Sequence, residues 1–233
     1  MHWRIAHRGA SGTCPENTVM AFRTAIAQGA NAIELDVHLC RSGDVVVIHD
    51  DTLERTTNGH GRIKDHTLVE LKQLDAGQGE PIPTLAEVFA EFGRDIAIFI
   101  ETKCDDVVLP AARLITEYAT AHAVPYAHMP VISFNWHHLA AVRTHNLQIL
   151  TGATPGRNDA HHAPEFIAHA RKSGMWSVNP NIEMLDASLI QAAHAAGLMV
   201  ITWTANTAED IRKSSSLGAD GVMSDWPQYF MGA

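Results

Sequence analysis

Short apolar segments recur along the chain, and amphipathic segments separate most of them. The apolar segments predict strands at residues 4–7, 32–37, 96–101, 131–134, 148–151, 177–180, 200–204 and 221–224. Helical patterns between them end at glycines, as in residues 16–28, 85–92 and 189–196. Eight β/α units in 233 residues predict an α/β protein with a (β/α)8 TIM barrel. A doubly wound sheet is the alternative, but it would more often carry a G-x-G-x-x-G turn, which is absent.

One further apolar run, residues 45–49, follows the second strand too closely for a parallel crossover, which needs about a dozen residues. We therefore expect residues 40–45 to form a hairpin whose return strand brings His49 level with Asp36. Residues 50–83 then break the β/α alternation with turn-forming sequence and a short helical pattern at 67–74. The chain is predicted to be a single domain, 1–233, with residues 50–83 as a small insertion over the barrel mouth.

Composition narrows the classes of partner. The net charge of −9 argues against nucleic acid and anionic membranes, because both attract basic surfaces. No apolar run approaches the ~18 residues of a membrane span, and no signal peptide is visible at the N-terminus. Three cysteines without paired spacing favour a reducing compartment, so a cytoplasmic location is expected. The oligomeric state stays open.

Histidine is abundant, with 15 copies. The pairs at residues 137–138 and 161–162 are predicted to be ordinary solvated positions near the starts of helices, because neither has an acidic neighbour that would complete a ligand set.

Acidic residues two positions apart stand out on the apolar strands. Glu34 and Asp36 share one face of the second strand, because side chains at i and i+2 point the same way. Glu101 ends a later strand, followed at i+2 by Lys103. Carboxylates gathered on one apolar surface repel each other unless a cation lies between them. The alternatives are solvated or ion-paired carboxylates, with Glu101 and Lys103 as a simple pair.

In a barrel, the carboxyl ends of all strands converge on one mouth. Three carboxylates there would supply the hard oxygen ligands that Mg²⁺ or Ca²⁺ prefers. Cationic side chains could neutralise a phosphate, and two histidines could serve as acid and base on either side of the phosphorus. The residues at or near this mouth are Glu34, Asp36 and Glu101; Arg8 and Lys103; His7 and His49; and Trp203.

The order of several motifs is specific. The chain resembles the glycerophosphodiester phosphodiesterase family from about residue 4 to residue 228. The matching pieces are His7-Arg8-Gly9 with Pro15-Glu16-Asn17-Thr18; Glu34-Leu35-Asp36-Val37; Val47-Ile48-His49-Asp50 with Thr52-Leu53, Arg55-Thr56-Thr57 and Gly59-His60-Gly61; Ile82-Pro83-Thr84-Leu85; Glu101-Thr102-Lys103; Thr202-Trp203-Thr204 with Asn206; and Gly218-Ala219-Asp220-Gly221 with Asp225-Trp226-Pro227.

The resemblance implies a TIM barrel that hydrolyses glycerophosphodiesters, small molecules, to glycerol 3-phosphate and an alcohol. It implies a divalent cation, Mg²⁺ or Ca²⁺, on the three carboxylates, His7 and His49 as acid/base pair, and Trp203 on the apolar side of a glycerol pocket. Arg8 and Lys103 would contact the phosphate. Departures such as Phe99 and Cys40 lie outside these positions. A phospholipid-active lyase that forms a cyclic phosphate and a non-catalytic ligand-binding barrel are the competing interpretations.

Overall fold

The computed structural model describes residues 3–156 and 163–232. Within them, eight parallel strands close into a barrel, because β1 pairs with both β2 and β9. A further strand, β3, pairs antiparallel with β2 outside the barrel. The strands are β1 Trp3–His7, β2 Ala32–Leu39, β3 Val45–Val47, β4 Ala97–Thr102, β5 Val131–Ser133, β6 Thr151–Ala153, β7 Ser177–Val178, β8 Met199–Thr202 and β9 Gly221–Ser224.

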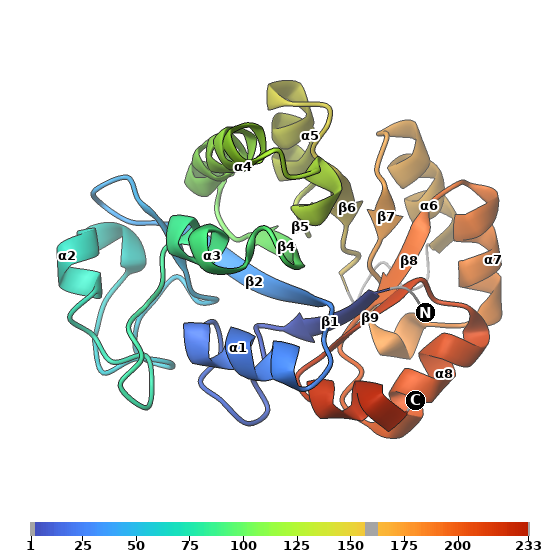
Figure 1. Cartoon of the computed structure of the whole chain (residues 1–233). Helices are drawn as coiled ribbons and strands as arrows, with labels where there is room; N and C mark the ends of the chain where they lie inside the picture. The colour runs from blue at the N-terminus through green and yellow to red at the C-terminus, as the bar shows by residue number, and fades with distance from the viewer. Residues whose placement is uncertain (1–2, 157–162, 233) are drawn as a thin grey trace.

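Helices surround the barrel, and the short helix α2 lies away from it at the left of Figure 1. The α-helices are α1 Val19–Ala27, α2 Leu68–Leu71, α3 Leu85–Phe92, α4 Val108–His122, α5 Trp136–His145, α6 Ala163–Lys172, α7 Ala187–Ala195 and α8 Ala208–Leu217. Short 3₁₀ helices are η1 Ile63–Asp65, η2 Asp105–Val107, η3 Tyr126–His128, η5 Ile182–Met184 and η6 Pro227–Gly232. The predicted (β/α)8 architecture is therefore confirmed.

Most strand predictions hold to within two residues, but the one at 148–151 is wrong. The strand β6 begins only at Thr151. The Asn146 side chain accepts a hydrogen bond from the Gln148 backbone N–H (2.9 Å), and the Ile149 N–H donates to the Asn146 carbonyl (3.3 Å). These bonds form a local turn over residues 146–149. The Asn146 side chain takes a backbone N–H that a strand would otherwise use for pairing.

The helix ends match some of the predicted start and stop signals and differ from others. Helix α3 spans the predicted residues, and Thr84 and Glu87 form the capping box. Helix α1 starts later than predicted, because Thr18 is its N-cap and Asn17 has a left-handed φ of 58°. Gly93 is not left-handed, with φ of −65°. A Cβ there would lie 2.7 Å from the Tyr118 ring, so close packing requires this glycine.

The hairpin prediction is confirmed in its pairing. In β3, Val47 pairs with Val37, and the next residue, Ile48, donates its N–H to the Asp36 carbonyl (3.0 Å). This bond brings the chain at His49 level with Asp36. The segment 50–83 packs on a small apolar cluster of its own with this hairpin, formed by Cys40, Val46, Ile48, Leu53, Ile63, Leu71, Ala76 and Ile82. The domain boundaries themselves remain a prediction.

The barrel interior is filled by apolar side chains below the mouth. Phe99 is fully buried there and makes an edge contact with Trp3, with ring centroids 5.7 Å apart. All three cysteines are free thiols. Among the described residues, no helix combines the length and apolarity needed to cross a membrane.

Candidate active site

Strand register places the predicted site residues side by side. His7 at the end of β1 pairs with Glu34 on β2, and Asp36, two residues further along β2, pairs with Glu101 on β4. Paired positions on neighbouring strands direct their side chains to the same face of a sheet. Glu34 and Asp36 also share a face, so all four side chains meet at one end of the barrel, where the strands finish.

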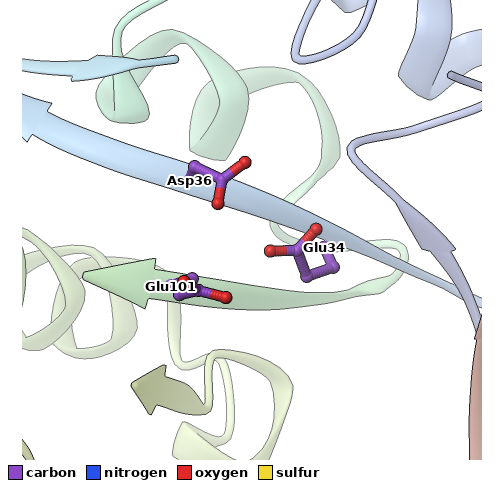
Figure 2. Close-up of side chains that lie close together, drawn as sticks. All are labelled: Glu34, Asp36 and Glu101. Atoms are coloured by element: carbon purple, nitrogen blue, oxygen red, sulfur yellow. The ribbon is translucent and has the colours of Figure 1, made fainter. Parts of the chain in front are cut away.

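Three carboxylates converge at this end. Oxygens of Glu34, Asp36 and Glu101 lie within 4.8 Å of one another, and Figure 2 shows the side chains reaching into a common space from the adjacent strands β2 and β4. Glu34 and Asp36 are each 1% exposed. Burial and the charge of Asp36 raise the pKa of Glu34 to about 8. Three carboxyl groups held this close can all be ionised only if positive charge lies nearby.

Two cations supply part of that charge. The Lys103 ammonium lies 2.7 Å from Glu101 Oε1 and 3.4 Å from Asp36 Oδ1. The Arg8 guanidinium lies 3.3 Å from Asp36 Oδ2, and its backbone N–H donates to Glu34 Oε2 (3.0 Å). Arg8 has a left-handed φ of 57°, which directs that N–H into the site. Burial would raise the pKa of Asp36, but Lys103 and Arg8 outweigh burial and lower it.

One oxygen of Glu34 is left without a partner in the described part of the chain. This oxygen, Oε1, is buried and accepts no hydrogen bond from the described residues. An orphaned buried carboxylate oxygen is costly unless a cation or another donor meets it. The neighbouring Asp36 and Glu101 add oxygen ligands of the type that Mg²⁺ and Ca²⁺ prefer. The residues present therefore fit a hard divalent cation.

His7 is oriented by a carboxylate behind it. Its Nδ1 lies 2.7 Å from Asp225 Oδ1, and Asp225 also accepts hydrogen bonds from Ser11 (3.0 Å) and Asn206 (2.6 Å). Burial would lower the pKa of His7, but the hydrogen bond to Asp225 and the charge of Glu34 outweigh it and raise the pKa. An ionised carboxylate only accepts, so Nδ1 carries a proton and Nε2 faces Glu34, 4.0 Å away.

His49, which lines the same cavity, has the same arrangement. Its Nδ1 lies 2.6 Å from Asp50 Oδ1, so Nε2 is again the free ring nitrogen. The backbone at His49 is held as well, because the His38 Nε2 lies 3.0 Å from the His49 carbonyl oxygen. Since a carbonyl only accepts, this Nε2 carries the proton of the hydrogen bond. Both histidines thus present Nε2 from rings held at Nδ1.

A cavity of about 140 Å³ joins these groups. Its polar wall contains both histidines, Arg8, Lys103 and two of the carboxylates, and its apolar wall contains Trp203 and Phe134. The Trp203 indole N–H donates to the Asn179 carbonyl (2.8 Å), and its ring meets Phe134 edge to face, with centroids 5.6 Å apart. The cavity thus combines charged groups with a fixed aromatic surface, as small-molecule sites commonly do.

The site includes residues to which the sequence pattern gave no role. Asn17 is buried and donates to Asp36 Oδ2 (2.9 Å), while Asp225 and Asp50 hold the two histidines. All three belong to the matched motifs, which was the one available signal.

The prediction that the histidine pairs are solvated is wrong for His138, which is buried and lies 2.8 Å from Asp105 Oδ1. Residues 161–162 lie outside the described part of the chain.

The convergence of polar side chains at the carboxyl ends of barrel strands places the protein in the class of TIM-barrel enzymes. The model of the glycerophosphoryl diester phosphodiesterase family matches residues 7–229. The chain therefore belongs to this family of phosphodiester hydrolases, as its motifs predicted.

Individual relatives agree with that assignment. The glycerophosphodiester phosphodiesterase of Caldanaerobacter subterraneus subsp. tengcongensis is 36% identical, over 96% of this chain and 94% of its own. A phosphodiesterase from Oleispira antarctica, solved with the product sn-glycerol-3-phosphate, is 31% identical with a TM-score of 0.84, over 98% of this chain and 94% of that one. The Thermotoga maritima glycerophosphodiester phosphodiesterase is 29% identical with a TM-score of 0.83, covering 100% and 98%.

The raised pKa of Glu34 predicts an unusual pH dependence of stability when divalent cations are chelated. Because folding raises its pKa from an ordinary ~4.3 to about 8, ionisation favours the unfolded state. Stability should fall as pH rises between these values. Glu34→Gln removes this loss. The melting temperature of the variant minus that of wild type should therefore be larger at pH 9 than at pH 5, by roughly 3–10 °C.

Asp36→Asn is the matched variant, measured by circular dichroism over the same pH range. Because Asp36 is ion-paired and its pKa is lowered, ionisation stabilises the fold above its ordinary pKa. The variant should therefore melt below wild type at both pH 5 and pH 9. Equal effects of Glu34→Gln at the two pH values would contradict the electrostatic assignment.

Proposed function

We propose that the protein hydrolyses glycerophosphodiesters to glycerol 3-phosphate and an alcohol, with a divalent cation, Mg²⁺ or Ca²⁺, as cofactor. The observation that carries this proposal is the pair of histidines, each held at Nδ1 by a carboxylate, in one cavity with the three converging acids. The product bound in the Oleispira antarctica relative supports the glycerol 3-phosphate part of the proposal.

Glu34, Asp36 and Glu101 would hold the cation. When bound, it would neutralise phosphate charge and polarise a phosphoryl oxygen. Arg8 and Lys103 are proposed to bind the remaining phosphate oxygens. Their contacts with Asp36 and Glu101 keep both cationic ends beside the cavity, which reduces the conformational freedom lost on binding.

His7 and His49 are proposed to move the protons. The Nε2 of one ring takes a proton from the attacking oxygen, which belongs to water or to a hydroxyl group of the substrate, as the new P–O bond forms; if the substrate hydroxyl attacks, water then opens the resulting cyclic phosphate. The Nε2 of the other ring gives a proton to the alkoxide oxygen as the old P–O bond breaks. Asp225 and Asp50 hold the rings in the tautomer that leaves Nε2 available.

Trp203 is proposed to line the apolar side of the glycerol subsite, since its ring is fixed by the hydrogen bond to Asn179 and the contact with Phe134. The partner is therefore a small molecule with a short carbon chain. We also expect a cytoplasmic enzyme, in keeping with three free cysteines.

A panel of diesters tests the proposed reaction. We expect glycerol 3-phosphate to appear from glycerophosphocholine or glycerophosphoethanolamine much faster than any product from micellar phospholipid.

Chelation should abolish the activity, and added Mg²⁺ or Ca²⁺ should restore it. Glu34→Gln and Asp36→Asn should weaken metal binding, measured by calorimetry, and keep the fold.

Any of four outcomes would contradict the proposal. Equal rates on phospholipid, or a cyclic phosphate detected by ³¹P NMR as the final product, would favour the lyase. Full activity in excess chelator would exclude the metal. Binding of diesters without turnover would favour a ligand-binding barrel.

Replacing either histidine tests the acid/base pair. His7→Ala or His49→Ala should lower kcat by roughly 10²–10⁴-fold, the range for one positioned proton-transfer group. The double variant should lose less than the product of the single losses, because the two groups act together. A nitrophenyl ester, whose leaving group needs no proton, should restore the rate of the variant that lacks the acid. Near-wild-type turnover of both single variants on the natural diester would exclude the pair.

A further inference from the structure

An arginine of the segment 50–83 connects two parts of the active site. The Arg55 guanidinium donates to both oxygens of Asp50, through Nε (2.6 Å) and Nη2 (3.0 Å). It donates equally to both oxygens of Glu16, through Nη1 and Nη2, each at 2.8 Å. Arg55 therefore makes two bidentate contacts at once, with carboxylates 39 and five residues away.

Each of these carboxylates holds a residue of the cavity. Asp50 Oδ1 is the partner of His49 Nδ1 at 2.6 Å. Glu16 Oε1 accepts from Arg8 Nη1 at 3.0 Å. Arg55 is thus one contact away from His49 on one side and from Arg8 on the other, although it does not line the cavity that contains them.

The contacts are too exposed to serve mainly stability. The Arg55 side chain is 46% exposed, and exposed ion pairs typically add little to the free energy of unfolding. Their geometry is nevertheless restrictive, because a planar guanidinium with two bidentate partners fixes the positions of both carboxylates. A lysine could keep the charge but not this double fork.

The charges of the two carboxylates agree with this geometry. The Arg55 hydrogen bond is the largest influence on the pKa of Asp50, which is strongly lowered. Burial would raise the pKa of Glu16, but Arg55 and Arg8 outweigh burial and lower it. Both carboxylates are therefore ionised acceptors at neutral pH, able to hold His49 and Arg8.

We propose that Arg55 is a positioning residue for the reaction, which orients His49 through Asp50 and Arg8 through Glu16. This inference rests on the proposed function for its kinetic part. It assigns the segment 50–83 a role in turnover beyond covering the mouth, because the segment supplies the group that holds a proton-transfer ring and a phosphate-binding cation in one geometry.

Arg55→Met is the main test, with glycerophosphocholine as substrate. We expect kcat to fall by roughly 10–100-fold, since small displacements of a reacting group are costly, and KM to rise by a smaller factor, because Arg8 is proposed to bind the phosphate. Arg55→Lys should resemble Arg55→Met and not wild type. Arg62→Met is the matched control in the same segment, because the one interaction of the Arg62 side chain with the described residues is a 3.8 Å ion pair with Asp51. It should retain wild-type kcat.

Double variants separate positioning from folding. If Arg55 acts through Asp50, then Arg55→Met should cost clearly less in kcat when made in Asp50→Asn than when made in wild type, and the same should hold in Glu16→Gln. A purely structural role predicts losses that multiply and a lowered melting temperature. Wild-type kcat in Arg55→Met, full activity in Arg55→Lys, or multiplying losses would overturn the proposal.

An imidazole signal tests the inference without turnover. In protein labelled with ¹⁵N at histidine, the His49 Nδ1–H proton should give a slowly exchanging resonance that Arg55→Met abolishes or broadens. The His7 Nδ1–H, held by Asp225 and without contact to Arg55, is the internal control and should persist. An unchanged His49 signal in Arg55→Met would overturn the inference, whether or not the wild type hydrolyses diesters. A wild-type protein that hydrolyses no diester would count against the proposed function alone.

Discussion

Electrostatic repulsion among Glu34, Asp36 and Glu101 is the constraint on which the site depends. Register brings Asp36 level with Glu101, and the alternation of β2 turns Glu34 to the same face. Burial removes the water that would otherwise screen these charges. Arg8 and Lys103 offset part of the repulsion, so the groups that neutralise the acids are the same groups proposed to bind phosphate. A divalent cation would offset the remainder.

A second constraint is the orientation of the two histidine rings, His7 and His49. Each imidazole has two nitrogens, and a proton-transfer role needs one of them fixed and the other free. Asp225 holds His7 from the end of β9, while Asp50 holds His49 from the end of the hairpin. The two supports differ: neutral donors back Asp225, whereas the Arg55 guanidinium backs Asp50. The two rings therefore differ in the charge that lies behind the carboxylate holding each of them.

Much of this arrangement was predictable because it follows strand periodicity. Glu34, Asp36 and Glu101 lie on regular strands, where an i, i+2 spacing fixes the face, and the short link after β2 required the hairpin that brings in His49. The motifs of the family supplied the assignment of the reaction.

What escaped prediction depends on contacts between distant segments or on local backbone geometry. The Asp225 carboxylate lies 218 residues from His7 in sequence, and no periodicity relates them. Arg8 directs its N–H at Glu34 through a left-handed backbone that its residue type does not favour. The start of β6 was misplaced because the turn formed by Asn146 competes with an apolar strand pattern. The prediction of a solvated His138 is wrong because its partner, Asp105, is 33 residues away in sequence.

The most direct test of the central claim is an anomalous diffraction experiment on crystals grown with Mn²⁺, which can replace Mg²⁺ at oxygen sites. The account predicts a strong anomalous peak bounded by oxygens of Glu34, Asp36 and Glu101, and its loss in Glu34→Gln crystals under the same conditions. A map of the active wild-type protein without a peak among these three carboxylates would contradict the account.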